Sequence, residues 1–227
     1  MQWQLHPEMN PNLFLKDPEN SVIGKKVIKN GVGLIRKIGF ELFTFKKLAE
    51  EIGTTEATIY RYFENKHKLL NYIVCWYFHW LDYQVMFNTH NITGYSTKIK
   101  ITIDILTWQL DANHVNNYDI AIDDLHEIIV SESSKVYLTK HVTEDNKEEL
   151  FLPYKKLCYN ISELFKAYNP NYKYPKSLSS TMIEMAHYQD FFMTNLPSLT
   201  DFGGKGDNAS VKDFLENLVF AALAKKD

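Results

Sequence analysis

A short stretch near residue 60 carries side chains that are suited to contact a nucleic acid. Hydroxyl, basic and acidic groups follow one another there within about two helical turns. Hydroxyl and basic groups can meet phosphates or base edges of DNA, and a carboxylate can accept a hydrogen bond from cytosine. The predicted contact residues on this stretch are Thr55, Glu56, Ala57, Thr58, Tyr60 and Arg61.

Some of these residues allow two interpretations. Phosphates repel the carboxylate of Glu56, so this side chain either reads a cytosine or faces solvent. Tyr60 either contacts DNA or packs against the first helix. Arg61 and Tyr62 can each point toward DNA or away from it. A single arginine on this helix means that the affinity must come largely from the surrounding lysines, which are Lys25, Lys26, Lys46 and Lys66.

Charge is unevenly distributed along the chain. The 227 residues have a formal net charge of −3, which alone argues against a partner made of phosphates. Residues 21–68, however, hold ten Lys and Arg against five Glu, whereas residues 1–20 and 69–227 are net acidic. This asymmetry favours a polyanion contact confined to the basic segment, and a charged, solvated face is the alternative explanation.

A first helix is predicted ahead of this stretch. Asp17 can cap it, Pro18 suits its first turn, and Gly39 supplies a stop. Apolar residues recur between these signals at the spacing of one helical face. They are Ile23, Val27, Leu34, Ile35 and Ile38.

Two short helices and a long one are predicted to follow. Thr44 can cap a short helix that ends at Gly53, Thr55 can cap the next, and Asn65 can cap the long helix. Two short helices joined by a tight turn that contains glycine form a helix-turn-helix unit. Its predicted core consists of Leu48, Ala49, Ile52, Ile59 and Phe63.

The run from Gly39 to Leu70 resembles the DNA-binding segment of the TetR family. It reads GFELFTFKKLAEEIGTTEATIYRYFENKHKLL. The Gly-Phe opening, the Thr before Leu-Ala-Glu, the Thr-Ile-Tyr-x-x-Phe run and the Lys-x-x-Leu-Leu run all stand at the family's spacing. The resemblance covers the first helix and this run, whereas residues 71–227 resemble the family only in length and helicity.

This resemblance implies further contact residues. In the family, the positions of Tyr60 and Lys66 contact the DNA backbone, as does the start of the second helix, here Thr44 and Lys46. Lys66 also begins the predicted fourth helix, where its charge and the free backbone N–H groups can together hold a phosphate.

The remaining part of the chain reads as further helices. No stretch shows sustained strand alternation, so the fold class is predicted to be all-α. The last two helices carry apolar residues that either complete the monomer core or, as the resemblance implies, pack with a second copy in a homodimer. The predicted helices are 95–112, 117–131, 133–142, 148–168, 177–196 and 209–224, with loops at 169–175 and 197–207.

The predicted fourth helix is rich in aromatic residues. Aromatic walls with few polar groups suit a hydrophobic or aromatic ligand. An aromatic stripe at helical spacing also fits an ordinary core. The candidate ligand-binding residues are Trp76, Trp80, Tyr83 and Trp108.

The sequence lacks the motifs that are typical of several other classes of protein. Cys75 and Cys158 lie far apart, so two buried thiols in a reducing cytoplasm are expected rather than a disulfide or a metal site. The histidines show no metal spacing, and no motif typical of phosphate, dinucleotide, zinc-protease or serine-hydrolase chemistry is present. No apolar run is long enough to span a bilayer. We expect no catalytic residue, metal, cofactor or membrane contact.

The sequence and the resemblance together predict an N-terminal extension (1–20), a three-helix helix-turn-helix DNA-binding domain (21–68) and a larger helical effector-binding and dimerisation domain (69–227). The expected function is that of a repressor released from a pseudo-palindromic, double-stranded DNA operator by a small hydrophobic or aromatic effector. The alternative is an all-α lipid- or small-molecule-binding protein or enzyme whose helix-turn-helix is structural. DNA binding that weakens steeply with salt would separate the two.

Overall fold

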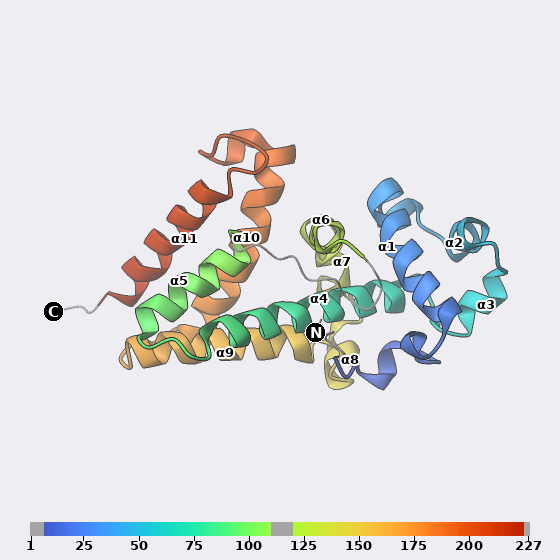
Figure 1. The fold of residues 1–227 in the computed structure, drawn as a ribbon, viewed down its shortest axis with the longest axis horizontal. Coiled ribbons are helices and arrows are strands. Elements are labelled where there is room, and N and C mark those ends of the chain that lie inside the picture. Colours follow the sequence, from blue (N-terminus) through green and yellow to red (C-terminus); the bar gives the residue numbers. More distant parts are fainter. Residues whose placement is uncertain (1–6, 110–119, 225–227) are drawn as a thin grey trace. The chain divides into compact units, whose positions relative to one another are not determined.

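Residues 7–109 and 120–224 are described by a computed structural model, and within them every regular element is a helix (Figure 1). The prediction of an all-α fold is therefore confirmed for this part of the chain. The described residues form two compact units: residues 7–78 with 120–153, and residues 79–109 with 154–224. The domain boundary predicted at residue 68 divides the chain by expected function and does not coincide with the boundary between the two compact units. The predicted domain division stays a prediction.

The first long helix, α1 (Val22–Leu42), begins later than the sequence predicts. Asp17 instead caps a short 3-10 helix, η2 (Pro18–Asn20), by accepting a backbone N–H at 2.8 Å. Ser21 caps α1, because its Oγ accepts the N–H of Gly24 at 3.0 Å. A Cβ at Gly24 would lie 2.3 Å from the carbonyl oxygen of the first residue of η2, so only glycine permits this close approach. An earlier 3-10 helix is η1 (Pro11–Leu13).

Helical geometry in α1 is interrupted at Gly39, where the sequence predicts a stop. This residue has φ 75° and ψ 156°, a conformation that favours glycine. One further turn, residues 40–42, follows the interruption before the backbone becomes extended at Phe43. The predicted stop is therefore a kink, after which the helix continues for a single turn.

The helix-turn-helix consists of α2 (Phe45–Ile52) and α3 (Glu56–Tyr60). Its caps are those that the sequence predicts. The side chains of Thr44 and Thr55 each accept the backbone N–H three residues further on, both at 3.3 Å. Gly53 ends α2 in the left-handed conformation, with φ 67°. Local sequence signals thus account for this whole motif.

The predicted core of this motif is buried at all but one position. Leu48, Ala49, Ile59 and Phe63 are buried, whereas Ile52 is half-buried. Phe45, which belongs to the predicted apolar face of the second helix, is also buried. Three aromatic side chains that the prediction left out complete this core: Phe40, Phe43 and Tyr62.

The longest helix, α4 (Lys66–Thr89), begins at its predicted cap, since Asn65 Oδ1 accepts the N–H of Lys68 at 2.9 Å. Its residues up to Phe78 belong to the first unit, and the later residues belong to the second. Within the first unit, α6 packs against α1. The remaining helices of this unit are α6 (Ile122–Glu132), α7 (Ser134–Tyr137) and α8 (Val142–Lys147).

The predicted bounds in this region need correction. The helix predicted at 117–131 is α6, which begins at Ile122, and residues 117–119 lie outside the described part. The helix predicted at 133–142 is the much shorter α7. Helix α8 is not predictable from the apolar pattern, because none of its residues is buried and it therefore lacks an apolar face.

The second unit combines the end of α4 with four further helices. Their packing brings α10 against α11, and α11 against α5. Ion pairs between Lys212 and Asp104 (2.6 Å) and between Lys100 and Glu216 (3.0 Å) also join α11 to α5. The helices are α5 (Tyr95–Leu106), α9 (Leu152–Tyr168), α10 (Pro175–Asn195) and α11 (Asn208–Leu223). All but the first two residues of α9 belong to this unit. The 3-10 helix η3 (Pro197–Leu199) lies between α10 and α11.

The four helices predicted for this unit are all present, although some of their bounds differ. The helix predicted at 95–112 ends at Leu106, and residues 110–112 lie outside the described part. The helix predicted at 148–168 begins at Leu152. Pro175, which the prediction places in a loop, is the first residue of α10, where the missing N–H of proline is tolerated. Among the described residues, no helix is both long and apolar enough to cross a membrane.

The two thiols are shielded to different degrees. Cys75 is buried and its Sγ donates to the carbonyl of Leu150 at 2.9 Å, whereas Cys158 is half-buried. Burial raises the pKa of Cys75 to about 12 and that of Cys158 to about 11. Both side chains are therefore unreactive thiols at neutral pH.

Candidate nucleic-acid interface

The outer face of α3 carries the residues predicted to contact DNA. Ile59 lies on the opposite face, is fully buried and anchors this short helix in the core. A helix held in this way presents its remaining side chains to a partner. Those that are exposed are Thr55, Glu56, Ala57, Tyr60 and Arg61, and Thr58 is half-buried.

The two threonines at the start of α3 interact with each other. Thr55 Oγ1 accepts the N–H of Thr58 and lies 3.0 Å from Thr58 Oγ1. One hydroxyl hydrogen is shared between these two oxygens, so the hydrogen of the other hydroxyl is available to a phosphate or a base edge. Thr55 thus combines helix capping with a position on the exposed face.

Tyr60 and Tyr62 point in different directions. The ring edge of Tyr60 contacts Phe45 of α2 at a centroid distance of 5.0 Å, yet the residue is 46% exposed. Tyr60 therefore packs against the second helix rather than the first and still reaches solvent. Tyr62 is buried, and its hydroxyl lies 2.8 Å from Ser21 Oγ, so it points inward.

The start of α2 presents a second set of predicted contacts. Thr44 and Lys46 are both exposed. The neighbouring Lys47 donates its Nζ hydrogen to the carbonyl of Leu42 at 2.8 Å and is thereby tied to the end of α1. Lys46 is exposed and available to a phosphate.

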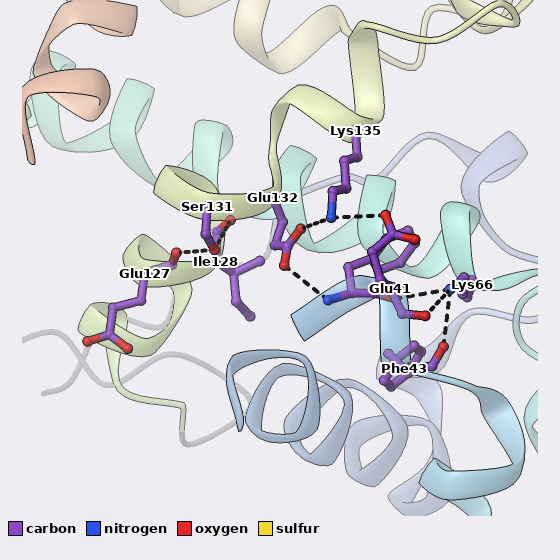
Figure 2. A network of polar contacts seen from close by, with 9 residues as sticks. Glu41, Phe43, Lys66, Glu127, Ile128, Ser131, Glu132 and Lys135 are labelled. Carbon is purple, nitrogen blue, oxygen red and sulfur yellow. Dashed lines mark hydrogen bonds and ion pairs between the residues drawn. The ribbon is translucent and has the colours of Figure 1, made fainter. Parts of the chain in front are cut away.

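Lys66 is engaged within the protein, and its predicted contact with a phosphate stays a prediction. Its Nζ donates to the backbone carbonyls of Phe40, Glu41 and Phe43 at 3.0, 3.2 and 3.2 Å (Figure 2). An ammonium group has three hydrogens, and in this arrangement each of them can be donated to one of these carbonyls. The carbonyls at a helix end lack partners within the helix, and Lys66 supplies them.

A second group of side chains, absent from the sequence analysis, holds the same end of α1. Glu132 of α6 accepts the N–H of Phe40 at 3.0 Å and pairs with Lys135 at 2.7 Å. Lys135 pairs in turn with Glu41 at 3.1 Å (Figure 2). The hydrogen bond and charge of Lys135 hold the pKa of Glu41 below its ordinary value. We name Lys66, Glu132, Lys135 and Glu41 the α1 clamp.

Several basic residues counted in the positive segment are engaged within the protein. Arg36 of α1 pairs with Asp124 at 2.8 Å and with Glu127 at 2.6 Å, both on α6. The hydrogen bond that Arg36 donates to Glu127 and the charge of Asp124 raise the pKa of Arg36. Lys68 pairs with Glu148 at 3.2 Å. The positive charge available to DNA is therefore smaller than the sequence count suggests.

The predicted ligand-binding aromatics are divided between the two units. Trp76 is buried in the first unit, and the other three belong to the second. Trp80 stacks on Trp108 at a centroid distance of 5.8 Å, and Tyr83 stacks on Phe87 at 5.8 Å. Trp108 has φ 59°, which is unusual for a bulky residue. The pairing of Trp80 with Trp108 agrees with the sequence analysis, whereas their contact with a ligand stays a prediction.

The last two long helices have apolar residues on more than one side. One set is buried within the unit and consists of Leu178, Met182, Val211, Leu215, Val219 and Leu223. A second set is exposed or half-buried and consists of Met185, Tyr188, Phe191, Phe192, Phe214, Leu218 and Ala222. Tyr188 and Phe192 stack at 6.0 Å within this second set. The predicted dimer surface is thus only partly used by the unit's own core.

These features define a helix-turn-helix DNA-binding protein: two short helices on a buried core, with hydroxyl and basic groups on the exposed face. Residues 27–73 match the family described as bacterial regulatory proteins, tetR family. This stretch of the chain is therefore similar to the DNA-binding segment of TetR-family regulators. A search of curated proteins finds no match.

Solved structures share the fold at low sequence identity. AibR in complex with isovaleryl coenzyme A and operator DNA has a TM-score of 0.60 and 13% identity, covering 90% of this chain and 98% of that one. The fatty acid degradation regulator FadR from Bacillus halodurans has a TM-score of 0.60 and 17% identity, covering 93% and 99%. The ketosteroid transcriptional regulator KstR2 of Mycobacterium tuberculosis has a TM-score of 0.55 and 10% identity, covering 91% and 97%.

Proposed function

We propose that this protein is a ligand-responsive transcriptional repressor that binds a pseudo-palindromic operator. The observation that carries the proposal is the exposed face of α3, which stands on a buried core and is capped at its start by Thr55. The match of residues 27–73 to the tetR family and the presence of a second helical unit support the same function. The protein would act in the cytoplasm, where its operator lies.

The proposed DNA contacts have two roles. Thr44 and Lys46 at the start of α2, with Tyr60 on α3, would bind phosphates and fix the position of the module on the duplex. Glu56 and Thr58 would meet base edges in the major groove. Thr55, Ala57 and Arg61 complete the proposed contact set.

A homodimer fits this use of DNA. Two recognition helices related by two-fold symmetry read two half-sites that lie about one helical turn apart. The partly exposed apolar residues of α10 and α11 supply a surface for the second copy. The expected dimer segments are those predicted, residues 177–196 and 209–224. Burial of this surface would remove apolar side chains from water and stabilise the pair.

The effector is proposed to be a small hydrophobic or aromatic molecule bound in the second unit. The stacked pair Trp80 and Trp108, with Tyr83 further along α4, offers an aromatic wall of the predicted kind. Trp76, which lies in the first unit, would report on α4 rather than line the same wall. AibR carries an acyl coenzyme A in its complex, and KstR2 is a ketosteroid regulator, which supports an apolar effector here.

A non-regulatory function is the less favoured alternative. An all-α enzyme or lipid-binding protein with a structural helix-turn-helix would not need hydroxyl and basic groups on the outer face of α3. Two of the three compared structures are described as regulators, and the third is bound to operator DNA. The two functions differ in whether DNA binds with sequence preference.

Selection of fragments from a random DNA pool by the purified full-length protein tests the proposal. The expected result is an inverted repeat bound by an even number of chains, with an affinity that falls steeply as salt rises. Weak binding that is independent of both sequence and salt would overturn the proposal and favour the alternative.

A screen of apolar compounds, acyl coenzyme A esters among them, tests the effector. A compound that releases the selected DNA should also bind less tightly when that DNA is present, because coupling is reciprocal. Trp80→Ala should alter this response while leaving the effector-free DNA affinity nearly unchanged. If no compound shifts the melting temperature or releases DNA, the protein is a constitutive DNA-binding dimer.

A further inference from the structure

The first unit contains a cavity that the proposed function does not use. It lies among the start of α4, α7 and α8 and has a volume of about 350 Å³. Ligand pockets usually measure roughly 300–1,000 Å³, so this space suits a small molecule. All of its lining residues belong to the first unit, and none of them is a predicted contact for DNA or for the apolar effector.

Two polar atoms at this cavity lack a hydrogen-bond partner among the described residues. One is Oδ1 of Asn71 on α4, a residue that is only 5% exposed. The other is Oγ1 of Thr139, on the segment between α7 and α8. Buried polar atoms are rarely left unpaired, because they have lost water without gaining another partner. A hydroxyl or amine of a bound molecule would donate to Asn71, and the hydroxyl of Thr139 can donate or accept.

Two lysines at the cavity can donate hydrogen bonds to an anion, although each is also paired with at least one carboxylate of the protein. Lys68 and Lys135 line it together with one carboxylate, Asp145. Lys68 forms one ion pair at 3.2 Å, and Lys135 forms two at 2.7 and 3.1 Å. An ammonium has three hydrogens, so each lysine keeps at least one for a ligand. The imidazoles of His67 and His141 add further donors.

We propose that this cavity binds a small anion that also carries hydroxyl groups, either a hydroxycarboxylate or a sugar phosphate. Lys68 and Lys135 hold its negative group, and Asn71 and Thr139 hold its hydroxyls. This chemistry is opposite to that of the apolar effector proposed for the second unit, so the two sites would take different molecules.

The cavity is connected to the DNA-binding module through Lys135. This lysine is part of the α1 clamp, where it pairs with Glu41 and Glu132. A bound anion competes with these two carboxylates for the ammonium group of Lys135. It therefore weakens the ion pairs that hold the end of α1. The resulting change in DNA affinity rests on the proposed function, whereas the binding itself does not.

Calorimetry on the full-length protein without DNA tests the binding. The probes are hydroxycarboxylates and sugar phosphates that include citrate and glucose 6-phosphate, with glucose and inorganic phosphate as the uncharged and hydroxyl-poor comparisons. We expect one of the two anion classes to bind and glucose to fail. The class that binds distinguishes a carboxylate site from a phosphate site. Absence of binding by every probe at millimolar concentration would overturn the proposal.

Substitutions locate the site. Asn71→Leu and Lys68→Gln should each weaken the binding of the successful probe at least tenfold, since each removes a group that holds it. Lys140→Gln, at an exposed position outside the cavity, is the matched control and should leave binding unchanged. Thr139→Val provides a second apolar variant, and melting temperatures show that each variant is folded. Unchanged binding by all three cavity variants would show that the probe binds elsewhere and would overturn the assignment.

Discussion

The helix-turn-helix and the end of α1 are neighbours in the chain, but their hydrogen bonds have opposite origins. In the helix-turn-helix they are local, since Thr44 and Thr55 each cap the helix that follows them. At the end of α1 they come from Lys66 and Glu132, which lie 26 and 92 residues from Phe40 in the sequence. The first region is therefore specified by its own residues, whereas the second depends on α4 and α6.

This difference connects the DNA-reading helices to the rest of the first unit. The clamped end of α1 leads through Phe43 directly to Thr44, the cap of α2. A change in the α1 clamp alters the position of the residues that lead into α2 and α3, although the two helices themselves keep their local caps. The comparison thus predicts large effects on stability at the clamp and smaller effects at the caps.

The largest effect is expected for Glu132→Ala. This substitution leaves the N–H of Phe40 without an acceptor and Lys135 without one of its carboxylates, at a position that is almost fully buried. Removing such a partner costs about 2–3 kcal/mol of unfolding free energy. Urea unfolding measures the loss. Glu132→Gln should lose less, because the amide oxygen still accepts the N–H. If Glu132→Ala is no worse than the exposed substitution Glu144→Ala, the clamp does not stabilise this region.

A smaller effect is expected for Thr55→Ala. Loss of an N-cap typically costs about 1 kcal/mol, and only α3 and its neighbours should loosen. Thr55→Asp should retain stability because a carboxylate also caps, while its charge should weaken DNA binding. Thr54→Ala, one residue earlier, provides the comparison in the same unfolding experiment. Equal stability of Thr55→Ala and Thr54→Ala would mean that the cap contributes nothing.

The smallest effect concerns pH. Burial, followed by the charge of Lys66, lowers the pKa of His67 below its ordinary value of 6.5. The unfolded chain therefore takes up this proton at a higher pH than the folded protein does. The contribution to stability is present above pH 6.5 and is lost as the pH falls below that value. Burial lowers the pKa of His79 as well, in the same direction.

His67→Gln should accordingly reduce the loss of melting temperature between pH 7.5 and pH 5.5. The exposed His90 supplies a matched substitution, His90→Gln. If His67→Gln loses as much stability as the unsubstituted protein over this range, proton uptake at His67 does not contribute.

The sequence predicts the elements of the recognition module because their signals are local. A threonine cap, a glycine in the left-handed conformation and apolar residues at helical spacing all lie within one or two turns of the structure they cause. The late start of α1 escaped prediction because two caps compete there. Asp17 and Ser21 both suit a helix start, and each caps one, but the helix at Asp17 is a single 3-10 turn.

The role of Lys66 was not predictable for a different reason. A lysine at the first position of a helix is typical of a phosphate contact. Nothing in the sequence indicates that backbone carbonyls accept the hydrogens of this ammonium group. Those carbonyls come from the turn after Gly39, and the kink at this glycine places them within reach of the ammonium. Glu132 carries no local signal at all, because its acceptor role is defined only when α6 packs against α1.

The cavity beside α4 is a further feature beyond the reach of the sequence. Asn71 lies within an apolar run of α4 and reads as an isolated polar residue. Its unpaired oxygen becomes informative only beside Thr139 and Lys135, which come from segments far away in the chain. Residues that are distant in the sequence and meet only in the folded protein form the part of the site that sequence patterns cannot predict.

The salt dependence of operator binding tests most directly the claim that the α2–α3 face meets DNA while Lys66 holds the end of α1. The logarithm of affinity falls linearly with the logarithm of salt concentration, and each lost phosphate contact reduces the slope by about one. Lys46→Ala is predicted to reduce the slope. Lys66→Met is predicted to lower the melting temperature and to keep the slope of the unsubstituted protein. An unchanged slope for Lys46→Ala together with a reduced slope for Lys66→Met would contradict the account.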